Sequence, residues 1–221
     1  MREDSRIIID HTHPIYQAMR ESVNQKHNGA YYYSKEIVDY FIPNIRTDRN
    51  WITVNTHGFG CDHAIMFIHS NLDTVRNYSW MTRHKDLVLV CGIPETAEML
   101  KEYGHTIYLP LSVKVDEVAR FRCEKDRDTA FAGRRVKRVG ADLSGCDFLE
   151  NIPRTELLRE MAHYKRVYAV GRTAIEALVL GCDVLPYDPR FPDPSIWKVV
   201  DTFEAIDILQ ERLDEYDRHC W

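Results

Sequence analysis

One stretch of the chain, Val167 to Pro186, constrains its fold more than any other. It begins with an apolar strand that leads into Gly171, continues as a helix that begins at about Thr173, and returns to a strand after Gly181. Parallel strands cannot be joined by a tight hairpin and need a crossover connection, which is usually a helix. The stretch therefore predicts a βαβ unit and, with it, an α/β fold built on a parallel sheet.

The same alternation of short apolar runs and helix-period segments continues over the rest of the chain. Strands are expected at residues 6–10, 51–55, 64–69, 86–91, 106–109, 129–132, 166–170 and 184–187, and helices at 14–24, 34–41, 72–82, 94–103, 155–162, 173–180 and 202–216. A charged stretch without strand character separates Leu109 from Arg127. We therefore predict two small Rossmann-like halves with parallel sheets. The first is an N-terminal domain of residues 1–112, and the second is a C-terminal domain of residues 113–221 with a terminal helix that packs back.

The composition is that of a soluble globular protein, with 44% hydrophobic and 29% charged residues. The six cysteines form no CxxC pair and several lie in apolar runs, so they indicate buried thiols in a reducing compartment. No apolar run approaches the roughly 18 residues that span a bilayer, and the start of the chain lacks the apolar core of a signal peptide. We expect a cytoplasmic protein without a membrane span.

The turn at Gly171 predicts a site for an anion. A helix that begins there points its N-terminus, with free N–H groups and a partial positive charge, out of the carboxyl edge of the sheet. Arg172 and Thr173 lie at this helix start, and Thr173 can also cap it. Glu176 follows in an apolar run, where a carboxylate needs good hydrogen bonds, and the two hydroxyls of a ribose would supply them. The alternative is a capped structural helix with Glu176 at its solvent-facing end.

A second candidate for phosphate binding follows the strand expected at residues 129–132. Gly133 allows a ligand to approach the backbone, and Arg134 and Arg135 are placed to clamp a diphosphate with two-pronged hydrogen bonds. Residues 114–140 carry nine Lys/Arg against five Asp/Glu, whereas the whole chain has a net charge of −5. The net charge argues against nucleic-acid binding by the whole surface. The basic stretch is therefore either a local phosphate site or a solvated face.

These segments, taken in order, resemble a known family. Tyr108-Leu-Pro-Leu-Ser-Val113 is followed by Ala132-Gly133-Arg134, an amphipathic helix, and Thr173-Ala-Ile-Glu176 in a helix that Gly181 ends. This order resembles the interdomain hinge and C-terminal domain of GT-B glycosyltransferases over residues 106–188. The resemblance implies a nucleoside-diphosphate sugar as the donor substrate and catalysis without a bound metal.

The resemblance also implies roles for single residues. The residues expected to bind the nucleotide sugar are Gly133, Arg134, Arg135, Gly171, Arg172, Thr173 and Glu176. Among them, Arg134 or Arg135 would meet the donor diphosphate, and Glu176 would bind the donor ribose. The expected reaction moves the sugar to an unknown hydroxyl on a small molecule, a glycan or, as in phage-type enzymes of this fold, a modified DNA base. The alternatives are a sugar-nucleotide epimerase or hydrolase and an inactive nucleotide-binding or interaction module.

The first half supplies the acceptor site in this family, so its polar loops hold the candidates for a catalytic base. His11 and His13 follow an apolar strand, and His57 lies in a glycine-containing loop after the next strand. Imidazole titrates near neutral pH, so any of the three could deprotonate an acceptor hydroxyl. Their spacing with Asp62 is not that of metal ligands, and no metal site is expected. The run of tyrosines at residues 31–33 either packs in the core or stacks on a sugar or base.

Overall fold

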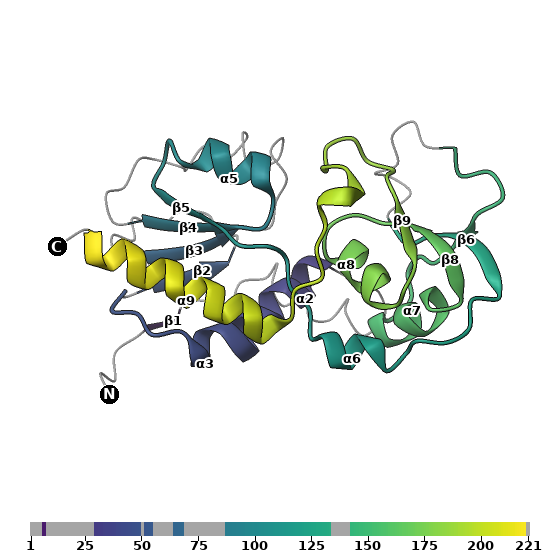
Figure 1. The fold of residues 1–221 in the computed structure, drawn as a ribbon, viewed down its shortest axis with the longest axis horizontal. Helices are drawn as coiled ribbons and strands as arrows, with labels where there is room; N and C mark the ends of the chain where they lie inside the picture. Colours follow the sequence, from purple (N-terminus) through teal and green to yellow (C-terminus); the bar gives the residue numbers. More distant parts are fainter. Residues whose placement is uncertain are drawn as a thin grey trace. The chain divides into compact units, whose positions relative to one another are not determined.

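The structure, a computed structural model, describes residues 6–7, 29–49, 51–54, 64–68, 87–133 and 142–219. These residues form two compact units, shown in Figure 1. The first unit takes its described residues from Met1–Thr12, Ser34–Pro110 and Phe203–Trp221, and the second from His13–Tyr33 and Leu111–Thr202. Each unit contains one sheet, and the strands within each sheet pair in parallel. The predicted α/β class with two Rossmann-like halves is therefore confirmed.

The first unit is built on a five-stranded sheet whose strands follow in chain order. They are β1 (Arg6–Ile7), β2 (Trp51–Val54), β3 (Ala64–Ile68), β4 (Leu87–Cys91) and β5 (His105–Tyr108). Every residue of β3 and β4 is buried, as in the central strands of a parallel sheet that is covered on both faces. The order of the described strands does not reverse at any point in this sheet.

Short helices lie between β1 and β2 and between β4 and β5 of the first unit. The chain returns to this unit within α2 (Gly29–Glu36), which continues through a π-helical turn, η1 (Ile37–Phe41), into α3 (Ile42–Asn44). The ring of Phe41 lies edge-on to that of Phe67 in β3, with 5.7 Å between the ring centres. Between β4 and β5 lies α5 (Pro94–Leu100), which begins at the predicted proline because the fixed φ of proline suits a first helical position.

The terminal helix α9 (Thr202–His219) belongs to the first unit from Phe203 onward and runs along its sheet in Figure 1. Leu209 and Leu213 are fully buried. Gln210 is bonded twice to the backbone of Arg46: its Oε1 accepts from the N–H at 2.6 Å and its Nε2 donates to the carbonyl at 3.1 Å. The helix therefore packs back on the first half of the chain, although the sequence boundary groups it with the second domain.

The spacing in the sequence predicts that Phe203 and Tyr216 share the buried face of α9. Tyr216 stacks on His105, with 4.1 Å between the ring centres. Phe203 is instead 46% exposed, with its ring edge-on to Tyr40. The buried stripe passes through Ala205 and Leu209, and at 3.6 residues per turn Phe203 falls at the margin of that stripe.

The second unit is built on a four-stranded sheet of order β7-β6-β8-β9. Its strands are β6 (Arg127–Phe131), β7 (Asp147–Phe148), β8 (Tyr164–Tyr168) and β9 (Asp183–Leu185). The strand order reverses between β6 and β8, because the chain adds its second strand on one side of the first and its third on the other. Two helices, α7 (Arg154–Met161) and α8 (Arg172–Val179), lead from β7 to β8 and from β8 to β9. Both helices follow a strand directly, so they begin at the carboxyl edge of the sheet.

Some short elements are absent from the sequence prediction. The stretch interpreted as a charged boundary contains α6 (Val115–Ala119), where the N–H of Val115 donates to Asp201 Oδ2 at 3.0 Å. The two-residue strand β7 and the 3-10 turn η3 (Pro194–Ile196) are too short for a periodic pattern to reveal them. The helices expected at residues 14–24 and 72–82 lie outside the described residues.

The described residues bear on two predictions, that the cysteines are thiols and that the chain has no membrane span. The four cysteines among them are free thiols; Cys91 and Cys182 are buried, whereas Cys123 is exposed. Burial raises the pKa of Cys91 to about 12. In the described part of the chain no helix has both the length and the apolar character needed to cross a bilayer.

Candidate functional site

The carboxyl edge of the second sheet holds two glycines that the sequence analysis identifies. Gly133 follows β6 and Gly171 follows β8, and these strands are neighbours: Phe131 is in register with Tyr168, and the N–H of Ala132 donates to the Tyr168 carbonyl at 3.0 Å. In open α/β sheets, ligands bind in the crevice outside the carboxyl ends of the strands, at the point where the strand order reverses. Here that point lies between β6 and β8, so both glycines flank it.

The start of α8 requires glycine because of its backbone conformation. Gly171 has φ 59° and ψ −137°, a region that other residues rarely enter. A Cβ there would lie 3.9 Å from the ring of Phe191, so space is not the constraint. The N-cap is Gly171, whose carbonyl accepts from the N–H of Ala174 at 3.0 Å; Thr173, expected as a cap, is the buried second residue of the helix. The first turn of α8 contains no acidic residue that would neutralise the partial positive charge of the helix start.

Gly133 is required by packing within the unit. A Cβ at this position would lie 2.6 Å from the hydroxyl of Tyr187 and 2.8 Å from the ring of Phe131. Both rings are buried and meet edge-on, with 4.9 Å between their centres. The sequence predicts that this glycine admits a ligand, and that stays a prediction; in the structure the glycine makes room for Tyr187.

A buried group of three charged side chains, Arg154, Arg172 and Glu176, lies beside the start of α8. Glu176 is fully buried, and its Oε1 accepts from Arg154 Nε at 2.8 Å and from Arg172 Nε at 3.3 Å. The arginine side chains are only 14% and 8% exposed. The Cζ atom of Arg154 also lies 5.1 Å from the ring centre of Tyr32. One carboxylate oxygen thus accepts from two guanidinium groups, and the interpretation that puts Glu176 at a solvent-facing helix end is wrong.

Arg172 connects this group to the segment that precedes α6. Its Nη1 donates to the carbonyl of Ser112 at 3.1 Å. Burial lowers the pKa of Arg172 from its usual value, and the neighbouring Glu176 carboxylate acts in the opposite direction. The carboxylate therefore helps to keep a buried guanidinium charged at the start of α8.

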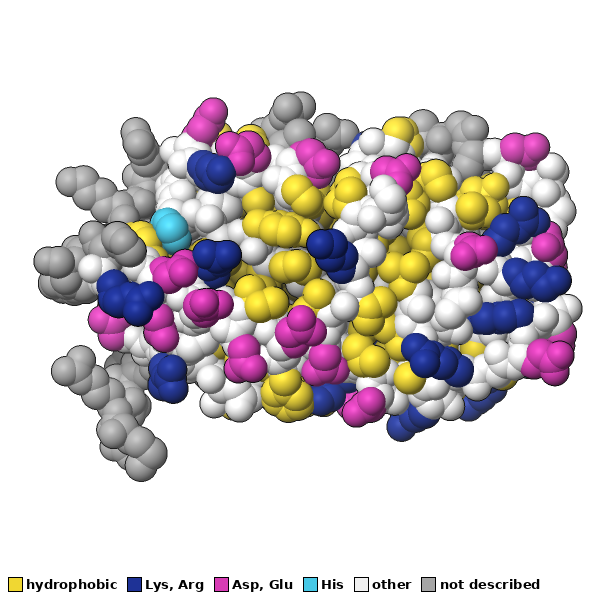
Figure 2. All heavy atoms as spheres, in the orientation of Figure 1, with side chains coloured by type: hydrophobic (Ala, Val, Ile, Leu, Met, Phe, Trp, Pro, Cys, Tyr) yellow, Lys and Arg dark blue, Asp and Glu magenta, His cyan; other side chains and the backbone are white. Residues whose placement is uncertain are grey.

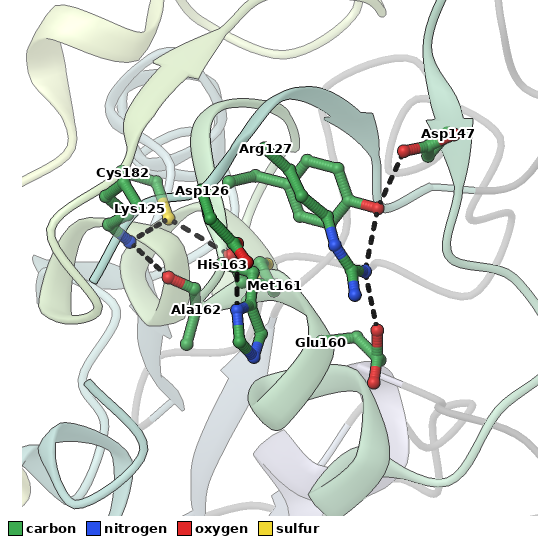
Figure 3. Close-up of polar contacts among 10 residues, drawn as sticks. Lys125, Asp126, Arg127, Asp147, Glu160, Met161, Ala162, His163 and Cys182 are labelled. Carbon is green, nitrogen blue, oxygen red and sulfur yellow. Dashed lines mark hydrogen bonds and ion pairs between the residues drawn. The ribbon is translucent and has the colours of Figure 1, made fainter. Parts of the chain in front are cut away.

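The amino edge of the same sheet holds a cation with a structural role. Lys125 Nζ donates to the carbonyls of Ala162 at 2.8 Å and Leu180 at 2.9 Å, the residues that end α7 and α8, and lies 3.2 Å from Cys182 Sγ. Figure 3 shows this ammonium group directed at Ala162 and Cys182. The last carbonyls of a helix have no partner within the helix, and a cation there also interacts favourably with the helix dipole. Lys125 therefore holds the ends of two helices together.

Part of the predicted basic stretch is used within the fold in the same way. Arg127 pairs with Glu160 at 2.9 Å and donates to the hydroxyl of Tyr164, which in turn donates to Asp147 at 2.9 Å (Figure 3). In Figure 2 the Lys and Arg side chains over this end of the second unit are interleaved with Asp and Glu. Lys125 and Arg127 therefore both have hydrogen-bond partners within the second unit.

The structure brings four of the predicted site residues together and leaves others untested. Gly171, Arg172, Thr173 and Glu176 lie in or next to the first two turns of α8, and Gly133 follows the neighbouring strand. Outside the described residues lie Arg134, Arg135, His11, His13 and His57. In the described ranges no three His, Cys, Asp or Glu side chains gather as they would around a metal ion.

Arg154 bonds the predicted site residue Glu176 and is not itself among the residues that the sequence predicts for the site. It is the first residue of α7, as Arg172 is the first residue of α8. A cation at this position opposes the helix dipole, and helix starts favour acidic side chains instead. An arginine at a helix start is unfavourable unless a negative group lies nearby. The arginines at the starts of α7 and α8 therefore predict a carboxylate close to both, and the sequence contains this signal.

The candidate site thus consists of the carboxyl ends of β6 and β8, the start of α8, and the buried charged group beside it. No protein-family model matches the chain, and the searches of curated proteins and of solved structures find no significant match.

Proposed function

We propose that this chain is a GT-B-like glycosyltransferase that moves a sugar from a nucleoside-diphosphate sugar to a hydroxyl acceptor. The observation that supports this most is the reversal of strand order between β6 and β8, with Gly133 and Gly171 on either side of it. Sheets of this kind bind nucleotides at such a point. The resemblance of residues 106–188 to the nucleotide-sugar-binding half of GT-B enzymes supports the class of reaction.

In this proposal the donor diphosphate binds at the start of α8. The N–H groups of a first helical turn have no acceptors within the helix, and their partial positive charge stabilises phosphate. Arg172 adds a full charge there while it remains bonded to Glu176 and to the carbonyl of Ser112. Arg134 and Arg135 come directly after Gly133 and are proposed to clamp the diphosphate from the neighbouring strand.

Glu176 has two proposed roles, and its burial favours one of them in the absence of a ligand. The resemblance assigns it the donor ribose, and a ribose could reach the carboxylate only if the site opened, because the side chain is fully buried. Its bonds to Arg154 and Arg172 support a role in holding these arginines. We propose that in the unliganded protein Glu176 holds Arg154 and Arg172 and does not contact a ligand.

Chemically, the transfer leaves negative charge on the departing diphosphate, and preorganised positive groups would stabilise it in the transition state. The helix start, Arg134 and Arg135 are the proposed groups, and no metal is needed for this role. The base that deprotonates the acceptor is proposed among His11, His13 and His57. The acceptor is a hydroxyl on a small molecule, a glycan or a modified DNA base.

We expect the full chain to release nucleoside diphosphate from a sugar nucleotide when pooled hydroxyl acceptors are present, and to do so equally with EDTA. Arg134→Ala should lower kcat by roughly 100-fold with a smaller change in KM, because the charge it meets develops mainly in the transition state. Arg159→Ala is the matched control, since Arg159 is an exposed arginine on α7. The measurement is chromatography of the nucleotide and sugar products over time.

Other outcomes of that assay would support different functions. Free or isomerised sugar without any acceptor would favour the hydrolase or epimerase. Binding of a nucleotide without turnover would favour the inactive nucleotide-binding module. Loss of activity in EDTA, together with full activity of Arg134→Ala and Arg135→Ala, would contradict the proposed mechanism.

A further inference from the structure

Residues 188–200 lie between β9 and α9, and this 188–200 segment begins beside the start of α8. The ring of Phe191 lies 3.9 Å from the position that a Cβ on Gly171, the N-cap of α8, would occupy. The N–H of Phe191 donates to the carbonyl of Asp188 at 3.0 Å, so a turn fixes the backbone here. The buried carboxylate of Asp188 also accepts from Arg190 Nε at 2.7 Å and Nη2 at 2.6 Å. The beginning of the segment is therefore held against the N-cap of α8.

The same segment ends beside the start of α8 as well. The N–H of Val113 donates to the carbonyl of Val200 at 3.2 Å. The residue before Val113 is Ser112, whose carbonyl accepts from Arg172 Nη1 at 3.1 Å. Because Arg172 is the first residue of α8, the 188–200 segment approaches this helix start at both of its ends.

Trp197 lies between these two ends and carries a buried polar group that lacks a partner. The residue is 7% exposed, and no acceptor among the residues that the structure describes lies within hydrogen-bonding distance of its Nε1. Its backbone N–H does have an acceptor, the carbonyl of Pro194 at 3.0 Å, so the unpaired group is the indole N–H alone. An indole N–H can only donate, and a buried donor without an acceptor is unfavourable. We therefore expect an acceptor that the described protein does not supply.

We infer that Trp197 is a ligand-binding residue and that its indole N–H donates to a phosphate oxygen of a group bound at the start of α8. The free N–H groups and the partial positive charge of the helix start favour an anion there. An anionic oxygen also forms a stronger hydrogen bond with the indole than a neutral acceptor does. The role of Trp197 rests on the proposed function, which assigns the donor diphosphate to this helix start.

Binding requires a shift of the 188–200 segment. Nε1 is covered in the unliganded protein, so a phosphate oxygen reaches it only when the segment moves relative to the start of α8. Trp197 directly follows the 3-10 turn η3, which lies between the contacts that hold the two ends of the segment. The liganded arrangement gains a hydrogen bond that the unliganded one lacks, and a ligand shifts such an equilibrium toward the state that it binds better.

The direct test is the indole N–H signal of Trp197 in NMR spectra of the ¹⁵N-labelled full chain during titration with inorganic pyrophosphate. The chain has four tryptophans, and the signal of Trp197 is the one that is missing from the spectrum of Trp197→Phe. Trp197→Tyr identifies the same signal if Trp197→Phe does not fold. We expect the proton resonance to move downfield as pyrophosphate binds, because the N–H gains a charged acceptor.

Calorimetric titration with pyrophosphate at low ionic strength measures the affinity. Trp197→Phe removes the donor and keeps an aromatic ring, and it should weaken binding roughly tenfold or more, as expected for a lost hydrogen bond to a charged group. Val200→Ala is the matched control, since it removes buried apolar atoms from the same segment and no side-chain donor. This control should keep the wild-type affinity.

Four results would overturn the inference. They are no pyrophosphate binding by the wild type, unchanged affinity in Trp197→Phe, equal losses in Trp197→Phe and Val200→Ala, and an unmoved Trp197 signal while pyrophosphate binds. The last result would mean that the N–H serves a buried water. An unmoved signal in a chain that transfers sugar would contradict this inference alone, whereas a Trp197 signal that responds in a chain without sugar transfer would contradict the proposed function alone.

Discussion

Glu176→Ala should destabilise the second unit by about 3–5 kcal/mol, the usual cost of removing one partner from a buried ion pair. The substitution removes the only carboxylate of the buried charged group and leaves two guanidinium groups, 14% and 8% exposed, without it. The expected result is a large fall in the urea midpoint of the chain, measured by circular dichroism. If Glu176 acted only on a ribose, the variant would lose affinity for nucleotide and unfold at the wild-type midpoint.

Two further variants make this test specific. Glu156→Ala removes an exposed carboxylate from α7 and should cost less than about 1 kcal/mol. The triple variant Arg154→Met, Arg172→Met and Glu176→Leu removes all three charges and should be more stable than Glu176→Ala, because apolar side chains replace a buried charged group at little net cost. A triple variant less stable than Glu176→Ala would show that the loss comes from packing and not from charge.

Lys125→Met should destabilise the second unit by about 2–4 kcal/mol, since one ammonium group serves the last carbonyls of two helices. The residues that carry these carbonyls, Ala162 and Leu180, are buried, so water does not readily replace the lost donor. Methionine keeps much of the length of the lysine side chain, and the loss therefore reports on the hydrogen bonds. Chemical denaturation of the variant and the wild type measures it directly.

The matched control for this prediction is Lys165→Met, at an exposed position of β8, which should change stability by less than about 0.5 kcal/mol. Lys125→Arg keeps a cation at the helix ends and should retain part of the stability. Equal midpoints for Lys125→Met and Lys165→Met would mean that the two carbonyl contacts contribute nothing to the stability of the fold.

The sequence predicts the parallel sheets because short strands, several of them apolar, alternate with helix-period segments. β3 and β4 are buried at every position, so each gives an unbroken apolar run. The turn at Gly171 is also predictable, because a glycine between a strand and a helix often marks a backbone conformation that other residues rarely adopt. The strand β7 and the helix α6 are too short to give a period, and their positions depend on pairing with distant residues.

The candidate site is predictable only in part, because its chemistry depends on contacts between segments far apart in the chain. Glu176 is recognisable as an unusual carboxylate in an apolar helix, whereas its partner Arg154 comes from the preceding helix. Gly133 is predicted to admit a ligand, but its close neighbour Tyr187, which follows β9, could not be predicted from the local sequence. The order β7-β6-β8-β9, which contains the reversal beside β6 and β8, cannot be read from the sequence, since every parallel arrangement has the same local pattern.

The central claim is that a nucleoside diphosphate binds at the carboxyl ends of β6 and β8. Hydrogen exchange of the full chain, measured by mass spectrometry with the diphosphates of uridine, adenosine, guanosine, cytidine and thymidine in turn, tests it most directly. We predict that at least one of them slows exchange in peptides that cover residues 131–133 and 169–176, while exchange in α9 stays unchanged, because binding stabilises the backbone that it contacts. If none of the five slows exchange in these two segments at millimolar concentration, the carboxyl ends of β6 and β8 are not a nucleotide site.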